Sequence, residues 1–135
     1  MPLANKKKIF AGLLLMIFAI VIYAVLHDVT NLQIFKNLKN TALIEWYKGF
    51  QQMSLQFLKR LPFFKFIKNH LVDILWFLSF SLVFTALLPL SKKIQFLLLL
   101  LMAFMSEFSQ ALFPALGTFD ILDLLSYIVI AIFFI

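Results

Sequence analysis

The sequence predicts an all-α integral membrane protein with four transmembrane helices and an amphipathic interfacial helix between the first and the second. Of its 135 residues, 64% are hydrophobic and only 13% are charged. Soluble domains are about half apolar and about one quarter charged, so this composition is typical of a protein in lipid. The apolar stretches show no alternation of period two, which argues against membrane-spanning strands. The length allows one small bundle, so residues 1–135 are expected to form a single membrane domain.

The first span is predicted over residues 9–26, which contain no charged side chain. Three lysines at positions 6–8 precede it, and a basic segment also precedes the apolar core of a signal peptide. The apolar core of a signal peptide is shorter, however, and the residues from His27 to Val29 do not form a small-x-small cleavage site. These features favour an uncleaved transmembrane helix.

Three further spans are predicted at about residues 71–88, 94–106 and 119–135. The second begins beside Asp73 and closes at Pro89, and the third runs from the residue after Lys93 to the polar residues before Phe108. The third and fourth spans are short for a hydrocarbon layer of about 30 Å. Their polar ends are therefore expected at the headgroups or in a recess.

Residues 27–70 form a basic segment that differs from an ordinary hydrophilic loop. Between Leu43 and Leu61 the apolar residues recur at helical spacing, while lysines and glutamines fall mostly on the other side. This pattern predicts an amphipathic helix that lies in the membrane interface. A helix that packs on the bundle and shields its core is an equally favoured alternative, and the two interpretations are compatible.

The composition also limits the chemistry that the protein can perform. The chain has no cysteine and two histidines, so disulfides, thiolate sites and zinc motifs are excluded, and no cofactor or metal is expected. The net charge of +6 favours contact with membrane lipid and its anionic head groups, and we expect no nucleic-acid partner.

The distribution of charges predicts the orientation in the membrane. With four spans, residues 1–8, the turn at 89–93 and the C-terminus share one face, and residues 27–70 and 106–120 share the other. The first face carries Lys6, Lys7, Lys8, Lys92 and Lys93 and no acidic residue. The second face has more basic residues in total, but the positive-inside rule weights short segments close to the spans. Both termini are therefore predicted in the cytoplasm, with the acidic residues outside.

Polar residues at three helix ends form the candidate site. Connectivity puts the start of the second span, the end of the third and the start of the fourth on the same side of the bilayer. The predicted polar cluster consists of Asp73, Glu107, Gln110, Asp120 and Asp123. Glu107 with Gln110, and Asp120 with Asp123, are three residues apart, so each pair can share one helical face. Possible compensating partners are Lys65, Lys68 and His70.

Simpler roles compete with a functional cluster for several of these residues. Asp120 could be an ordinary N-cap, for which the arguments balance, and Glu107 could be solvated at the boundary. Asp123 lies between apolar pairs, and an acid at the edge of an apolar helix usually turns toward a partner or a water-filled recess. For Glu107 and Asp123 we therefore favour a functional cluster. For His70 and for the basic residues Lys59, Arg60, Lys65 and Lys68 we favour a plain interfacial role.

The C-terminal half resembles the VanZ-like membrane proteins of bacteria. The matching segments are His70–Trp76, Ser106–Gln110, Phe113–Pro114 and Gly117–Tyr127. They reproduce Glu-x-x-Gln at a helix end, a short loop and Asp-x-x-Asp entering the last helix. The resemblance covers about residues 69 to 130, and it implies the bacterial cytoplasmic membrane as location and, for the founding member, an association with glycopeptide (teicoplanin) resistance. It implies no reaction.

Three classes of function fit these observations. The first is a non-catalytic envelope protein whose outward acidic cluster binds an envelope component or a cationic ligand. The second is a small intramembrane enzyme acting on a lipid-linked substrate, with two carboxylates as acid and base or as ligands of a divalent metal. The third is an accessory subunit that packs against another membrane protein. Because no nucleophile or metalloprotease motif is present, we favour a non-catalytic protein and leave enzymatic activity open.

Overall fold

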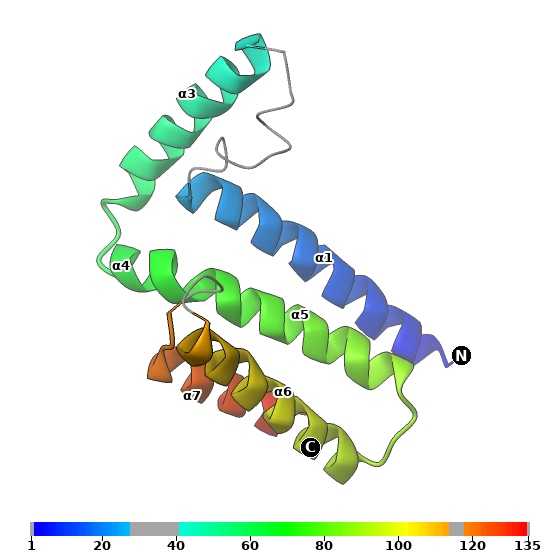
Figure 1. Cartoon of the computed structure of the whole chain (residues 1–135). Coiled ribbons are helices and arrows are strands. Elements are labelled where there is room, and N and C mark those ends of the chain that lie inside the picture. Colours follow the sequence, from blue (N-terminus) through cyan, green and yellow to red (C-terminus); the bar gives the residue numbers. More distant parts are fainter. Residues whose placement is uncertain (1, 28–40, 114–117, 135) are drawn as a thin grey trace. The chain divides into compact units, whose positions relative to one another are not determined.

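A computed structural model describes residues 2–27, 41–113 and 118–134, and every regular element in these ranges is a helix (Figure 1). The elements are α1 (Leu3–Leu26), α3 (Thr41–Leu58), α4 (Phe64–Phe66), a π-helical turn η1 (Ile67–Leu71), α5 (Val72–Leu87), α6 (Lys92–Leu112) and α7 (Ile121–Ile132). The all-α prediction is confirmed for the described residues. Residues 28–40, which include the first part of the predicted interfacial segment, and residues 114–117 lie outside them.

Among the residues that the structure describes, three helical segments are long and apolar enough to cross a membrane. They are α1, the continuous run from Phe64 to Leu87, and α6. These segments indicate a membrane protein. The fourth predicted span corresponds to α7, whose 12 described residues extend about 18 Å, less than the hydrocarbon layer of about 30 Å.

Three of the helices are longer than the membrane spans predicted from hydropathy. α1 begins at Leu3 and includes the lysines before the apolar stretch, and the second apolar helix begins at Phe64 instead of residue 71. α6 continues past the polar residues at 106 and 107 to Leu112. The physical reason is that a helix needs only its backbone hydrogen bonds, whereas hydropathy marks only the part of the helix suited to hydrocarbon.

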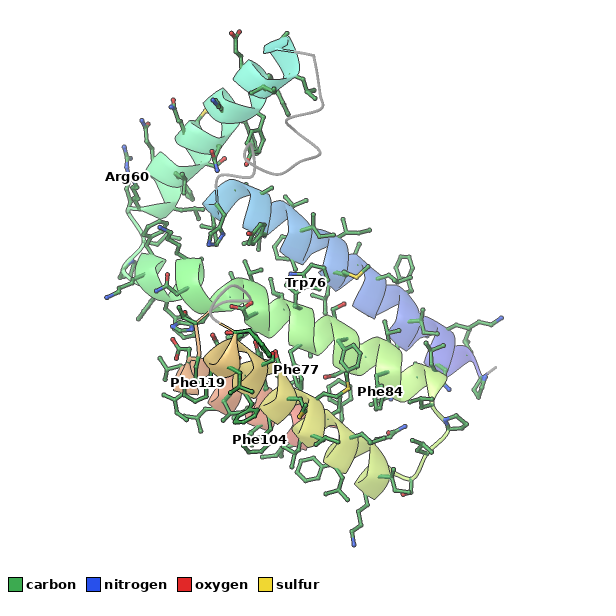
Figure 2. All side chains as sticks on the ribbon, viewed as in Figure 1. Arg60, Trp76, Phe77, Phe84, Phe104 and Phe119 are labelled. Carbon is green, nitrogen blue, oxygen red and sulfur yellow. The ribbon has the colours of Figure 1, made fainter. Side chains whose placement is uncertain are left out.

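The chain divides into two compact units, of which the first comprises the described residues of 1–17 and 73–135. Its core is formed by Ala103, Leu124 and Tyr127, with Phe77 and Ile128 packed against them. These residues come from α5, α6 and α7. Figure 2 shows Phe77 on the side of α5 that faces α6.

Side chains in this unit tie one helix to the backbone of another. The Asn5 side-chain amide donates to the Ala86 carbonyl at 3.0 Å, and the Ser79 hydroxyl donates to the Gly12 carbonyl at 2.7 Å. The Gln95 amide donates to the carbonyl of Leu88 at 2.8 Å. Since lipid supplies no hydrogen-bonding partners, such bonds satisfy the polar side chains inside the apolar unit.

The second unit comprises the described residues of 18–72. Here α3 supplies two polar side chains to the last turn of α1. The Tyr47 hydroxyl donates to the Ala24 carbonyl, and the Gln51 amide donates to the His27 carbonyl at 2.8 Å. The last carbonyls of a helix have no partner within it, so these bonds satisfy groups that would otherwise be orphaned.

We predict that Gly12→Ala destabilises the first unit. A Cβ atom at Gly12 would lie 2.7 Å from the Val83 Cγ2 atom and 3.0 Å from the Ser79 carbonyl oxygen, so α1 and α5 would have to separate. Overpacking of this kind lowers the free energy of unfolding by about 1–3 kcal/mol. Unfolding in mixed micelles with increasing SDS, followed by circular dichroism, measures it.

Gly49→Ala is the matched control, because a Cβ atom at Gly49 of α3 meets nothing within 4 Å. This substitution should leave stability unchanged or raise it by about 0.5–1 kcal/mol, as alanine is the better helix former. Equal stability of the two variants would contradict the close approach of α1 and α5 at Gly12.

Candidate functional site

Glu107 is the last residue of a buried stripe along α6. The buried residues of this helix are Gln95, Leu99, Ala103 and Glu107, each four positions after the last. Residues four apart lie on one helical face, so the face that buries Leu99 and Ala103 also carries the Glu107 carboxylate inward. Helix geometry thus forces the acid into the interior.

The two oxygens of the Glu107 carboxylate have different environments. The side chain is only 1% exposed. Its Oε2 atom accepts a hydrogen bond from the Asp120 backbone N–H at 3.0 Å, which joins the end of α6 to the start of α7. Its Oε1 atom is buried and has no hydrogen-bond partner among the described residues. A buried carboxylate oxygen without a partner is unfavourable, because the interior does not replace the lost water.

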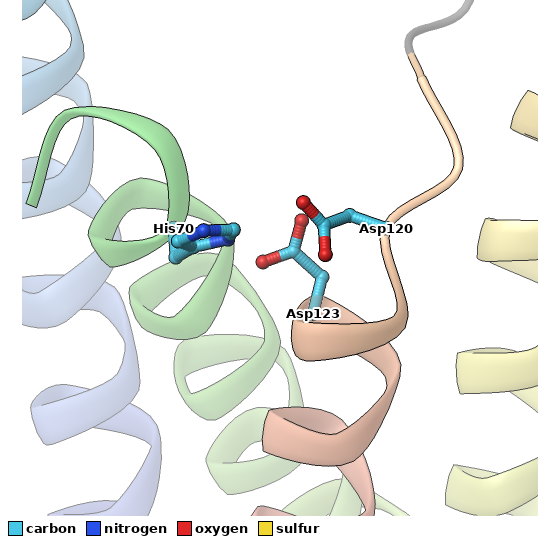
Figure 3. Close-up of side chains that lie close together, drawn as sticks. All are labelled: His70, Asp120 and Asp123. Carbon is cyan, nitrogen blue, oxygen red and sulfur yellow. The ribbon is translucent and has the colours of Figure 1, made fainter. Parts of the chain in front are cut away.

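Asp120 and Asp123 place two further carboxylates at the start of α7 (Figure 3). Asp120 is the N-cap, and its Oδ1 atom accepts the Leu122 backbone N–H at 2.8 Å. Asp123 lies in the first turn and is 7% exposed. The positive end of the helix dipole stabilises acids at both positions.

The three acids interact with one another. Oxygens of Asp120 and Asp123 approach within 4.8 Å, and both residues interact electrostatically with Glu107. We call these three residues, Glu107, Asp120 and Asp123, the acid junction. Oxygen atoms from carboxylates are the ligands of hard divalent cations and also pair with organic cations, so the acid junction can accept either kind of positive charge.

A recess beside the acid junction contains the other two cluster residues predicted from the sequence. Its volume is about 300 Å³. The lining residues are Asp73, Trp76, Phe77 and Phe80 of α5, Met102, Ser106 and Gln110 of α6, and Tyr127 of α7. Sequence spacing places Glu107 and Gln110 on one face of α6, but their surroundings differ. Glu107 accepts a hydrogen bond from the N-cap residue of α7, whereas Gln110 lines the recess.

Tyr127 links the recess to the acid junction, although sequence reasoning did not select it. It is 5% exposed, and its ring stacks on Phe77 with centroids 4.5 Å apart. Asp73, Glu107 and Asp123 all interact electrostatically with its hydroxyl group. The sequence feature that could have identified Tyr127 is its position four residues after Asp123, which puts both side chains on one face of α7.

The predicted basic partners belong to the other unit of the chain. Lys65 lies in α4, and Lys68 and His70 lie in η1. Within that unit the His70 ring lies 5.1 Å from the ring of Phe66. Compensation of the acid junction by these three residues stays a prediction.

Comparison with known proteins gives no relative from which a role could be transferred. No protein-family model, curated protein or solved structure matches the chain.

We predict that Glu107→Ala loosens the start of α7, whereas Glu107→Gln does not. Alanine removes the acceptor of the Asp120 N–H, which costs about 1–3 kcal/mol for a buried donor. Glutamine keeps an acceptor oxygen and removes a buried charge. Hydrogen exchange at the Asp120 amide should therefore accelerate in the alanine variant and stay close to the parent rate in the glutamine variant. Parent-like exchange in both variants would show that Glu107 does not hold α7.

Proposed function

We propose that this chain is a VanZ-like protein of the bacterial cytoplasmic membrane, and that its acid junction binds a cationic group of an envelope component at the extracytoplasmic face. The function is binding without catalysis, and its cellular consequence is resistance to a glycopeptide such as teicoplanin. The observation that carries the proposal is the buried Glu107 carboxylate, whose Oε1 atom has no partner among the described residues.

The physical argument rests on the cost of burying negative charge. Three carboxylates lie close together, and two of them, Glu107 and Asp123, are buried. The α7 dipole and the Asp120 N–H offset part of this cost, but neither supplies a hydrogen bond to Oε1 of Glu107, which has no partner in the part of the chain that the structure describes. A bound cation would supply the missing interaction, because carboxylates in a low-dielectric environment pair strongly with positive charge. The arrangement therefore suits a ligand with a positively charged group.

The proposed orientation follows from the lysines near the starts of α1 and α6. α6 begins with Lys92 and Lys93, which the positive-inside rule assigns to the cytoplasm. Glu107 lies 15 residues after Lys92, about 22 Å along the helix axis, so it is in the far half of a hydrocarbon layer of about 30 Å. In this proposal α7 is the fourth span, which returns toward the cytoplasm, and both termini lie inside.

The proposed interfacial position of α3 is supported by its exposed side chains. Trp46, Phe50, Met53 and Phe57 are exposed large apolar residues on this helix, and Lys48 is exposed as well. Aromatic residues combined with lysine are typical of helices at the level of the lipid headgroups. We propose that α3 lies there, on the extracytoplasmic side that the charge distribution predicts for residues 27–70.

A metal-dependent intramembrane enzyme is the second candidate, favoured by the approach of Asp120 and Asp123 within 4.8 Å. Two carboxylates at this separation could supply oxygen ligands to one divalent ion. Electron paramagnetic resonance with Mn²⁺ as the probe separates the candidates. Stoichiometric Mn²⁺ that is lost in Asp123→Asn would favour the enzyme, and absence of bound Mn²⁺ would favour the binding protein.

We predict that cysteines introduced at Lys93 and Lys48 react with thiol reagents from opposite sides of the membrane. The parent chain has no cysteine, and both positions are exposed, so each label reports one site. A membrane-impermeant maleimide added to intact cells should label Lys48→Cys and spare Lys93→Cys, which becomes labelled only after lysis. The reverse pattern would overturn the proposed orientation.

We predict that Glu107→Gln abolishes the resistance that the parent confers. Expression of the parent in a teicoplanin-susceptible bacterium should raise the minimal inhibitory concentration, and the glutamine variant should return it to the empty-vector value at equal membrane abundance. Asp120→Asn is the comparison, because a neutral asparagine still caps α7 and should retain most of the effect. Full resistance in both Glu107→Gln and Asp123→Asn cells would refute a role for the acid junction.

A further inference from the structure

The recess between α5 and α6 changes from polar to apolar along its length. Asp73 and Gln110 lie near the ends of α5 and α6 that approach the acid junction, and Phe80 and Met102 lie farther along the same helices. Phe80 lies seven positions after Asp73, about 10 Å along the axis of α5. Met102 lies eight positions before Gln110, about 12 Å along the axis of α6. One end of the recess is therefore charged and hydrogen-bonding, and the other end is lined by hydrocarbon and an aromatic ring.

Aromatic rings form most of the wall on the α5 side. Phe77 stacks on Tyr127, which makes a continuous aromatic surface, and Trp76 and Phe80 complete it. Trp76 is 40% exposed and Phe80 is 36% exposed, so this wall is accessible from outside the protein. The faces of these rings attract organic cations, most strongly that of tryptophan.

The volume limits the size of an occupant. About 300 Å³ lies at the lower end of the range for small-molecule sites, so the recess holds one small ligand or a single aliphatic chain with its head group. Asp73 provides negative charge, which repels an anionic amphiphile and pairs with a cationic one.

We propose that this recess binds a single-chain amphiphile with an ammonium head group, which enters from the bilayer between α5 and α6. The ammonium group pairs with Asp73 beside the rings of Trp76 and Tyr127, Gln110 and Ser106 accept hydrogen bonds from it, and the aliphatic chain contacts Phe80 and Met102. This inference rests on the proposed membrane location. It assigns a second site for a cation, made of residues other than those of the acid junction.

Quenching of tryptophan fluorescence by a brominated amphiphile tests the proposal. The chain has two tryptophans, so Trp46→Phe leaves Trp76 as the single reporter. The full-length variant is placed in nanodiscs of phosphatidylcholine and titrated with 11-bromoundecylammonium, or with 11-bromoundecanol, which has the same tail and no charge. We expect saturable quenching by the ammonium probe, stronger than that by the alcohol at equal membrane content. Equal quenching by the two probes would overturn the proposal.

Two substitutions locate the effect in the recess. Asp73→Asn should weaken binding of the ammonium probe by about tenfold or more and leave the response to the alcohol unchanged. Ser106→Leu, at an exposed position of α6 that lines the recess, should fill it and abolish saturable quenching. Ser126→Leu is the same exchange on α7 outside the recess and should bind as the parent does. Parent-like binding in both Asp73→Asn and Ser106→Leu proteins would refute this site.

Glu107→Gln separates this inference from the proposed function. If ammonium binding is retained in Glu107→Gln while resistance is lost, both proposals are supported. If ammonium binding is absent in the parent although Glu107→Gln abolishes resistance, the recess proposal is wrong and the acid junction keeps its role. A second titration in nanodiscs that contain phosphatidylethanolamine with brominated chains identifies the source of the amine. Quenching there that exceeds quenching in nanodiscs of phosphatidylcholine with the same brominated chains would overturn the single-chain amphiphile in favour of a phospholipid. A response to 11-bromoundecylammonium alone supports the single-chain amphiphile.

Discussion

The hydrogen bond from the Asp120 N–H to Glu107 Oε2 is the interaction on which the functional part of the molecule depends. It joins the last part of α6 to the residue that caps α7, and so fixes where α7 begins. On that helix, Asp123 follows Asp120 by three residues, and Tyr127 follows Asp123 by four. Their positions beside Glu107 and Phe77 are therefore consequences of one contact between a buried acid and a backbone amide.

A second constraint is the scarcity of hydrogen-bonding partners in an apolar protein. Within each unit, polar side chains that project from one helix donate to backbone carbonyls of another. Ser79 and Gln95 do so in the first unit, and Tyr47 and Gln51 do so in the second. In soluble proteins, water could satisfy many of these groups, whereas here the bonds also hold helices together. Among the described residues, Glu107 Oε1 and His27 Nδ1 are buried without a hydrogen-bond partner, and the first of these atoms is the basis of the proposed binding function.

The acid junction and the recess divide the polar residues of the first unit into two environments. The acid junction consists of carboxylates at the start of α7 and at the facing residue of α6. The recess combines one carboxylate with aromatic rings and an apolar end, so it discriminates by shape as well as by charge. Tyr127 lines the recess, where its ring stacks on Phe77, and its hydroxyl group interacts electrostatically with Glu107 and Asp123 of the acid junction. A positively charged ligand in either environment would change the electrostatic field at Tyr127.

Hydropathy and helical spacing alone were sufficient to predict that the described residues are helical and that three of the four predicted spans lie in helices long enough to cross a membrane, because these features depend on residues close together in sequence. The fourth span and the interfacial position of α3 stay predictions. The helices at the first and third spans extend beyond the predicted spans, since the lysines before Ile9 and the acid at position 107 do not interrupt backbone hydrogen bonding. Helix packing decided the rest. The burial of Glu107 opposite α7, the separate position of Gln110 in the recess and the stacking of Tyr127 on Phe77 depend on how α5, α6 and α7 rotate about their axes. That rotation follows from contacts between residues 13 to 50 positions apart, which no local pattern encodes.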